Sequence, residues 1–376
     1  MLNSFFNNFS YYKWWKNLDK SILTFIITFF LIGLFFSLVS TSLIASDKLD
    51  TNSYFFFFKH LTFVIFGIII IFIFSYMEIK TLYVISIFSF FICFSLLILV
   101  PIVGIEVKGS KRWLDLFFLP RIQPIEFVKP FFIMMLAFII SNKRISNFSL
   151  RFIFSFLLTS SIGSLLIMQP DLGQTLLICF SWIILIFVSG INLIFLLSIS
   201  TLGMTLLLYI TFYVPKFEYI KNRLLSFFNA ETGTHNFQSD RAIDSVTSGG
   251  FFGKGIGEGT LKNRVPEAHT DYIISVISEE FGVIVIMLIL VLFLVFIYLI
   301  FKKVENETDN TNKLILIGLA SLILLQAMIH IGVNIRLFPT TGMTLPFLSY
   351  GGSSIISTSI LSGIILNLTK RKVKTQ

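Results

Sequence analysis

The sequence GGFFGKGIGEGTLKNRVPEAHTDYIISVISEEFG, residues 249–282, joins a polar loop to an apolar segment. The loop is dense in glycine, which lets the backbone approach a ligand closely and present its N–H groups. Asp271 lies where this loop ends and the apolar segment 272–301 begins. A segment of that length can cross a bilayer as a helix. The stretch therefore predicts a polar site for an anionic ligand at the face of a membrane.

The rest of the chain has the composition of a membrane protein, because 55% of its 376 residues are hydrophobic and only 13% are charged. Apolar runs of roughly 17–25 residues recur, and they are too long and continuous for the strands of a membrane barrel. We expect an all-α, polytopic integral membrane protein that forms one domain over residues 1–376. The expected transmembrane helices number about ten, at 22–45, 60–77, 82–103, 125–141, 152–168, 172–188, 192–214, 272–301, 314–335 and 345–368.

An even number of spans places both termini on one side of the membrane. Basic residues mark the cytoplasmic side of such proteins, and the loops on the side of the termini are basic. The expected cytoplasmic tails are 1–21 and 369–376, and the large outer loop is 215–271. The basic residues of the inner side are Lys143, Arg144, Arg151, Lys302, Lys303, Lys313, Lys370, Arg371, Lys372 and Lys374.

The outer loops are also basic, which opposes the usual charge asymmetry. Either this charge is tolerated while the flanking loops set the orientation, or the cations meet an anionic ligand on the outer face. The outer cations are Lys108, Lys111, Arg112 and Arg121 in the first loop and Lys216, Lys221, Arg223, Arg241, Lys254, Lys262 and Arg264 in the second.

Several other kinds of site are not indicated. Cys93 and Cys179 fall inside apolar runs, where small core residues are expected rather than a disulfide or a metal pair. The four histidines have no ligand spacing, so no histidine metal site is expected. We interpret the 46 phenylalanines as a biased composition, so no nucleic-acid partner is expected.

The first polar cluster contains Lys111, Arg112, Gln123, Glu126 and Lys129. Glu126 and Lys129 are three residues apart and can pair on one helical face. One interpretation is a self-neutralising pair near the interface. The other is a phosphate site in which Lys111, Arg112 and Lys129 bind the anion and Glu126 orients them.

Carboxylates mark two further positions. Asp171 follows Pro170 in a tight turn and can cap the next helix, and capping alone also explains Asp271. Glu279 and Glu280 lie about 12–14 Å deeper along the helix, so they must be paired or protonated. Because they are adjacent, we expect only one of them to face the cavity.

The last cluster, residues 339–354, combines glycine, proline and hydroxyl side chains. Such a segment either packs helices closely through small residues or breaks a helix so that its backbone lines a polar cavity. The chain has no phosphate-binding P-loop, HExxH motif or serine nucleophile elbow. The residues alone leave two functions open, transport of a lipid-linked anion and an enzyme that acts on one.

Together these motifs resemble the SEDS family of bacterial cell-envelope proteins, over essentially the whole chain and in matching order. Segments 123–130 and 339–346 are more similar to FtsW, the division member, than to RodA, although 113–116 is slightly similar to RodA. The motifs that carry the resemblance are GSKRW at 109–113, QPIE at 123–126, QPDLG at 169–173, the glycine-rich segment 249–259, PEAHTD at 266–271, EEFG at 279–282 and LPFLSYGGSS at 345–354.

The resemblance implies a peptidoglycan glycosyltransferase that polymerises lipid II at the outer face of the bacterial cytoplasmic membrane, at the division septum. The reaction would invert the anomeric carbon and release undecaprenyl pyrophosphate. The implied partners are lipid II, a class B penicillin-binding transpeptidase, divisome proteins and membrane lipids. The alternatives are a lipid II flippase, a RodA-type elongation enzyme and a divisome scaffold. The near absence of ionisable groups in the inner half of the spans favours an enzyme over a flippase.

The family's essential aspartate corresponds to Asp271, which would act as the general base or would hold a divalent cation, Mg²⁺ or Mn²⁺, on the pyrophosphate. No tightly bound cofactor is implied. The residues expected to bind lipid II and its pyrophosphate are Lys111, Arg112, Gln123, Glu126, Lys129, Lys254, His269, Ser349, Gly351 and Gly352. The residues expected to support them are Asp171, Glu267 and Glu280.

Overall fold

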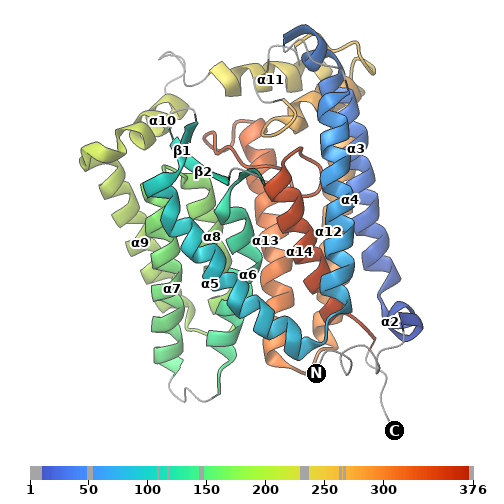
Figure 1. The fold of residues 1–376 in the computed structure, drawn as a ribbon. Helices are drawn as coiled ribbons and strands as arrows, with labels where there is room; N and C mark the ends of the chain where they lie inside the picture. Colours follow the sequence, from blue (N-terminus) through green and yellow to red (C-terminus); the bar gives the residue numbers. More distant parts are fainter. Residues whose placement is uncertain are drawn as a thin grey trace.

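The computed structural model describes residues 11–48, 54–107, 110–116, 119–143, 148–228, 237–261, 265 and 268–371. Most of this part is a bundle of long apolar helices that stand side by side (Figure 1). The helices of the bundle are α3 (Lys20–Lys48), α4 (Phe55–Tyr76), α5 (Ile79–Val103), α6 (Pro124–Ser141), α7 (Phe148–Met168), α8 (Leu172–Val188), α9 (Leu193–Tyr213), α12 (Ile273–Glu305), α13 (Asn310–Asn334) and α14 (Gly352–Leu368).

Each expected span coincides with one of these helices, so the all-α membrane fold is confirmed. Within the described residues, eight helices are long and apolar enough to cross a membrane. The other two, α8 and α14, are 17 residues each, at the lower limit for a crossing. The number of ten crossings therefore stays a prediction. Several helices begin earlier than expected, as at Phe55 instead of residue 60.

The start of the last span was predicted wrongly, because α14 begins at Gly352 and not at residue 345. The preceding segment is a loop in which Phe347 adopts a positive φ of 67°. Two contacts hold it, since the Ser349 hydroxyl accepts the N–H of Leu345 (2.9 Å) and donates to the carbonyl of Thr270 (2.7 Å). These contacts satisfy backbone groups that a helix would otherwise pair internally.

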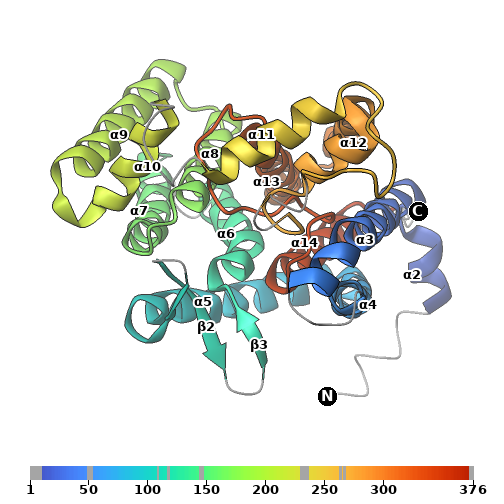
Figure 2. The same ribbon diagram turned by 90° about the horizontal axis from the view of Figure 1, so that it is seen from above.

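The centre of the bundle contains α6, α13 and α14, whose residues are mostly buried, whereas α9 is almost entirely exposed at the edge. Figure 2 shows this arrangement from above, with the other helices around the central ones. A short helix, α2 (Tyr11–Asn17), lies at the end of the bundle opposite to α10 (Glu218–Phe228) and α11 (Phe237–Gly249) (Figure 1). The C-terminal end of α14 is beside α2, since the Arg371 N–H donates to the carbonyl of Asn17.

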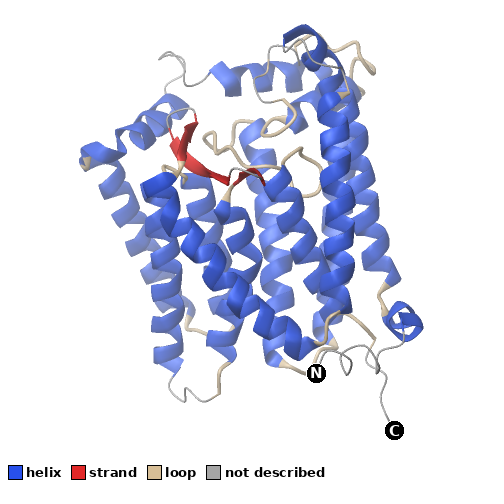
Figure 3. Ribbon diagram, in the orientation of Figure 1, coloured by secondary structure: helices blue, strands red, loops and turns tan. Residues whose placement is uncertain are grey.

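The connection between α5 and α6 forms a small antiparallel sheet, which the sequence analysis did not foresee. Its strands are β1 (Ile105–Val107), β2 (Ser110–Leu116) and β3 (Leu119–Ile122), paired in the order β1-β2-β3 (Figure 3). Side chains of a strand alternate between its two faces. The segment with Lys111 and Arg112, which the sequence analysis considered for phosphate binding, is therefore also part of the central strand of this sheet.

The glycine-rich loop is inserted into a break in α12. Gly282 has non-helical dihedral angles (φ 78°, ψ 175°), and the helix divides there into two parts. Four backbone bonds join loop and helix: Lys254 N–H to the Glu279 carbonyl (2.9 Å), Gly255 N–H to the Glu280 carbonyl (3.0 Å), Val283 N–H to the Gly250 carbonyl (3.0 Å) and Ile284 N–H to the Phe251 carbonyl (3.4 Å). The loop thus satisfies the backbone groups that the break leaves unpaired.

Candidate active site

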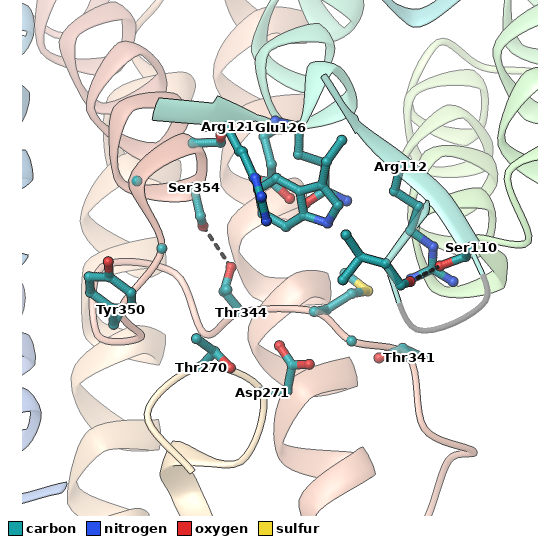
Figure 4. Close-up of a pocket in the computed structure, with 18 of the residues that line it drawn as sticks. Ser110, Arg112, Arg121, Glu126, Thr270, Asp271, Thr341, Thr344, Tyr350 and Ser354 are labelled. Atoms are coloured by element: carbon teal, nitrogen blue, oxygen red, sulfur yellow. Dashed lines mark hydrogen bonds between the residues drawn. The ribbon is translucent and has the colours of Figure 1, made fainter. Parts of the chain in front are cut away.

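A cavity of about 580 Å³ lies between the ends of the central helices and the sheet. Asp271, Arg112 and Glu126 all line it, so three of the predicted motifs meet there (Figure 4). The other lining residues are Lys59, Phe63, Val107, Ser110, Trp113, Pro120, Arg121, Gln123, Arg223, Gln238, Thr270, Tyr272, Val333, Thr340, Thr341, Gly342, Met343, Thr344, Tyr350, Gly351, Gly352, Ser353 and Ser354.

Asp271 lies just before α12, and its carboxylate faces the loop that contains Thr341 and Thr344 (Figure 4). The backbone at this point is held from α13, because the Asn334 side-chain amide donates to the Asp271 carbonyl (3.1 Å). A Cβ atom added at Gly342 would lie 3.6 Å from both Asp271 Oδ2 and Arg112 Nη1. Gly342 therefore lies close to both the Asp271 carboxylate and the Arg112 guanidinium.

Arg112 reaches the cavity from β2 and is fixed by the turn between α7 and α8. Its guanidinium donates to the carbonyls of Gln169 (3.3 Å) and Pro170, and its Nε lies 3.6 Å from Asp171 Oδ2. Asp171 also caps α8, since its carboxylate accepts the N–H of Gln174 (3.4 Å). Both predicted roles of Asp171 are therefore compatible, because it caps a helix and orients Arg112.

The charge of Asp171 depends on this arrangement. Burial raises the pKa of Asp171 above its ordinary value, although Arg112 and the N–H of Gln174 act in the opposite direction. Gln123 also contacts the carboxylate, as its Nε2 lies 3.5 Å from Oδ2. Gln123 itself lines the cavity, as expected.

Glu126 and Lys129 form a buried ion pair, which is the simpler of the two interpretations of this motif. Lys129 Nζ lies 2.8 Å from Glu126 Oε2 and donates to Gln326 Oε1 at 2.9 Å. The other Glu126 oxygen accepts from Gln174 (2.8 Å). Only Glu126 lines the cavity, so the structure does not place Lys129 where it was expected to contact the anion. Its ammonium is already used within the helix bundle.

Two other predicted cations do not line the cavity. Lys111 is exposed on β2 and, unlike Ser110, Arg112 and Trp113 of the same strand, does not line the cavity. Lys254 pairs instead with Glu279, with 3.7 Å between its Nζ and Oε1. The cations that do line the described cavity are Lys59, Arg112, Arg121 and Arg223.

Three of these cations were not selected from the sequence. Arg121 and Arg223 belong to the basic loops that the sequence analysis assigned to the outer side, so the excess charge was a signal but did not identify individual residues. Arg223 is on α10 and donates to the carbonyl of Thr340 (3.0 Å). Lys59 is in the first turns of α4, where no motif distinguishes it.

The remaining predicted binding residues divide between the wall of the cavity and its support. Gly351 and Gly352 line the cavity. Ser349 and His269 do not. Ser349 fixes the loop as described above, and the His269 ring packs against Phe56 with 4.9 Å between ring centroids. Glu267 lies outside the described residues.

Neither Glu279 nor Glu280 faces the cavity, so the expectation that one of them does is wrong. Both are buried and bind the inserted loop. Glu279 Oε1 accepts the N–H of Leu261 (2.8 Å), and Glu280 Oε1 accepts the N–H of Gly257 (3.4 Å). The helical positions of Glu279 and Glu280 therefore do not decide which of them faces the cavity, because the inserted loop lies beside the break in α12 and both side chains contact it.

A protein-only metal centre is not found in the described part of the chain, where no group of three or more His, Cys, Asp or Glu side chains could hold a metal ion. Asp271 nevertheless fits a different mode. Mg²⁺ is typically bound by one or two carboxylates together with phosphate oxygens of the substrate and water.

The family model described as "Cell cycle protein", for FtsW, RodA and SpoVE, matches residues 19–374. The chain belongs to this family. It is 36% identical over 281 residues to the probable peptidoglycan glycosyltransferase FtsW of Trichlorobacter lovleyi, which covers 73% of this chain and 72% of that protein. It is 33% identical to the stage V sporulation protein E of Bacillus subtilis over 94% of this chain and 98% of that protein.

Solved structures with the same fold are known. One comes from work on the coordination of polymerisation and crosslinking by a peptidoglycan synthase complex, with a TM-score of 0.77 and 24% identity. Another is the rod shape determining protein RodA of Thermus thermophilus, with a TM-score of 0.67 and 24% identity. Each match covers 94% of this chain and 97% of the other chain.

Proposed function

We propose that this protein is a peptidoglycan glycosyltransferase that polymerises lipid II on the outer face of the cytoplasmic membrane during cell division. The observation that carries the proposal is the cavity that Asp271 lines together with four cations, Lys59, Arg112, Arg121 and Arg223. Relatives at 36% and 32% identity are named as probable peptidoglycan glycosyltransferases FtsW, which supports the division role over the elongation role.

The proposed reaction forms one glycosidic bond and breaks one bond to phosphate. The 4-hydroxyl of the acceptor GlcNAc attacks the anomeric carbon of the donor MurNAc while Asp271 accepts the hydroxyl proton as general base. The bond between that carbon and the pyrophosphate oxygen breaks on the opposite face, so the carbon is inverted. Undecaprenyl pyrophosphate leaves with the electron pair.

The cations account for stabilisation of the leaving group. Arg112 is held by two backbone carbonyls and Asp171, so it needs little rearrangement when negative charge develops on the pyrophosphate. Arg121, Arg223 and Lys59 line the same cavity. They replace Lys111, Lys129 and Lys254 in the assignment that the sequence favoured.

A divalent cation and a partner complete the proposal. Asp271 would hold Mg²⁺ or Mn²⁺ through its carboxylate, and the ion would supply charge neutralisation at the pyrophosphate. The transpeptidase partner is proposed to be a class B penicillin-binding protein at the division septum, together with other divisome proteins. The solved peptidoglycan synthase complex of the same fold supports such a partner.

A lipid II flippase is the competing function, and the packing below the cavity argues against it. A flippase needs a polar route through the membrane for the sugar and the pyrophosphate. Beyond Lys129, α6 buries Phe132, Ile133, Leu136 and Ala137 completely in the hydrophobic core. Glu126 is therefore the last residue of α6 that lines the described cavity.

Proteoliposomes with lipid II in both leaflets test the two functions together. Glycan chains that require the protein, with and without its transpeptidase, support the enzyme. Asp271→Asn should make no glycan, and Asp244→Asn is its matched control, because Asp244 is a half-exposed aspartate on α11 that does not line the cavity. Transfer of lipid II between leaflets without any glycan product, in the presence of Mg²⁺ and the partner, would show a flippase instead.

A further inference from the structure

Three buried polar side chains form a row on one face of α13. Gln326, His330 and Asn334 are four residues apart, so they lie above one another with about 6 Å between successive positions. Their exposed fractions are 5%, 1% and 0%. Polar groups buried this deeply in an apolar helix are costly unless they are hydrogen-bonded, so their partners show what the row does.

Every member of the row holds the backbone of a residue that lines the cavity. Gln326 Nε2 donates to the Thr344 carbonyl (2.9 Å), and His330 Nδ1 donates to the Met343 carbonyl (2.7 Å). Because a carbonyl oxygen can only accept, the histidine carries a proton on Nδ1. Asn334 Nδ2 donates to the Asp271 carbonyl (3.1 Å).

The side-chain amides have one possible orientation, because their second contacts have fixed polarity. The ammonium of Lys129 can only donate, so Gln326 Oε1 must face it and Nε2 must face Thr344. The N–H of Ser275 donates to Asn334 Oδ1 (3.1 Å), which leaves Nδ2 for Asp271. In both amide side chains the nitrogen therefore faces the carbonyl of a residue that lines the cavity, and the oxygen faces a donor elsewhere in the bundle.

The row connects both sides of the cavity. Its lower end joins the Glu126–Lys129 pair, its centre holds residues 343–344, and its upper end holds Asp271. Residues 343–344 directly follow Gly342, which lies close to both the Asp271 carboxylate and the Arg112 guanidinium. A shift of this loop or of the Asp271 backbone would therefore change the gap between the proposed base and the cationic wall.

We propose that Gln326, His330 and Asn334 are positioning residues that set the gap between Asp271 and the cationic wall. They act through backbone carbonyls and do not line the cavity themselves. The inference rests on the proposed glycosyl transfer for its kinetic consequence, whereas the contacts have a structural consequence that is independent of the reaction. A misplacement of about 1 Å can cost about 100-fold in rate.

His330 gives the sharpest test, because one substitution removes the donor and another restores it. His330→Leu introduces an apolar side chain of moderate size, which has no donor for the Met343 carbonyl. His330→Asn places its Nδ2 on Cγ, the atom that carries Nδ1 in histidine, so it can donate to the same carbonyl. Ser321→Ala is the matched control, since Ser321 is also buried on α13 but lies outside the row.

The first measurement is steady-state polymerisation of lipid II by the full chain with its transpeptidase. We expect His330→Leu to lower kcat at least tenfold while KM changes less than twofold, and His330→Asn to restore kcat to within threefold of the parent. Ser321→Ala should match the parent. Unchanged kcat in His330→Leu, or equal loss in both His330 variants, would overturn the inference.

The second measurement is hydrogen exchange of the same proteins without substrate, which does not depend on the reaction. In His330→Leu, exchange over residues 339–345 should be at least fivefold faster, with parental rates in His330→Asn. Unchanged exchange in His330→Leu overturns the inference even if the protein makes no glycan. Absence of glycan from the parent with the expected exchange pattern would instead count against the proposed function alone.

Discussion

The insertion of the glycine-rich loop into α12 leads to a quantitative prediction for Gly253→Ala. Gly253 has a φ of 78°, and an added Cβ would lie 2.2 Å from the Glu280 carbonyl oxygen and 2.4 Å from its carbon. Both atoms belong to the backbone of α12, so no side-chain rotation relieves the overlap. The loop must move away from the helix.

The expected cost has two parts. A left-handed conformation costs a residue with a Cβ about 1–2 kcal/mol. Loss of the four backbone bonds between loop and helix adds about 2–6 kcal/mol, at about 0.5–1.5 kcal/mol for each bond. Gly257→Ala separates the parts, because Gly257 has a φ of 85° with no atom within 4 Å of an added Cβ. It should show the first cost only.

Hydrogen exchange at the four bonded amides, those of Lys254, Gly255, Val283 and Ile284, measures the second cost directly. A difference of about 2 kcal/mol between the variants corresponds to about 30-fold faster exchange in Gly253→Ala. Thermal unfolding in detergent should follow the same order. Equal protection of these amides in both alanine variants would refute the insertion of the loop.

Three further predictions concern other contacts. Lys129→Met should destabilise the protein by about 3–5 kcal/mol because it leaves a buried carboxylate unpaired, whereas Lys129→Met with Glu126→Gln should recover most of the unfolding temperature in detergent. Arg112→Lys should lower kcat/KM for lipid II at least tenfold, since a lysine cannot reproduce the planar set of contacts to two carbonyls and a carboxylate; an unchanged kcat/KM would remove Arg112 from stabilisation of the leaving group. Burial acts to raise the pKa of Asp19, but the hydrogen bond from Lys303 and backbone N–H groups outweigh it and hold that pKa below its ordinary value. Because the pKa of Asp19 is lower in the folded state, its ionised carboxylate stabilises the fold above the unfolded pKa of about 3.9, and this stabilisation is lost as pH falls through the folded pKa. Between about pH 6 and 3, the unfolding temperature of Lys303→Met should therefore decline less than that of the parent.

The sequence predicted the helices well because their signal is local. An apolar run of spanning length has few alternatives in a membrane, so the positions of α3 and α13 follow from hydropathy alone. The error at residue 345 has a physical cause, because the apolar residues of this loop pack into the core without being helical. Phe347, for example, is buried against Phe29 with 5.2 Å between ring centroids.

The residues that line the cavity were predicted in part. Asp271, Arg112, Gln123, Glu126 and two glycines line the cavity as expected. The pairing of Lys129 with Glu126 was predicted from their spacing. The second partner of Lys129 was not predictable, because Gln326 is 197 positions away and no spacing rule relates them. A buried lysine and a substrate-binding lysine look alike in sequence, and only the packing of α6 against α13 separates them.

The hydrophobic pattern of the sequence also did not predict the break in α12. Glu279 and Glu280 occupy helical positions, but an inserted loop occupies the space into which their side chains extend. The glycines at 253 and 282 were the available signal, since both adopt positive φ where the two backbones cross. Their density was interpreted as ligand binding, and at these two positions it serves backbone contact within the protein.

The most direct test of the central claim is glycan synthesis from lipid II by the purified protein with its transpeptidase, compared between the parent and Asp271→Asn. The amide keeps the size of the side chain and removes the base. We expect polymer from the parent and at least a 100-fold lower rate from Asp271→Asn, with the variant still folded and still bound to its partner. Polymer at the parental rate from Asp271→Asn would contradict the account, because the reaction would then not need the carboxylate that is proposed as its base.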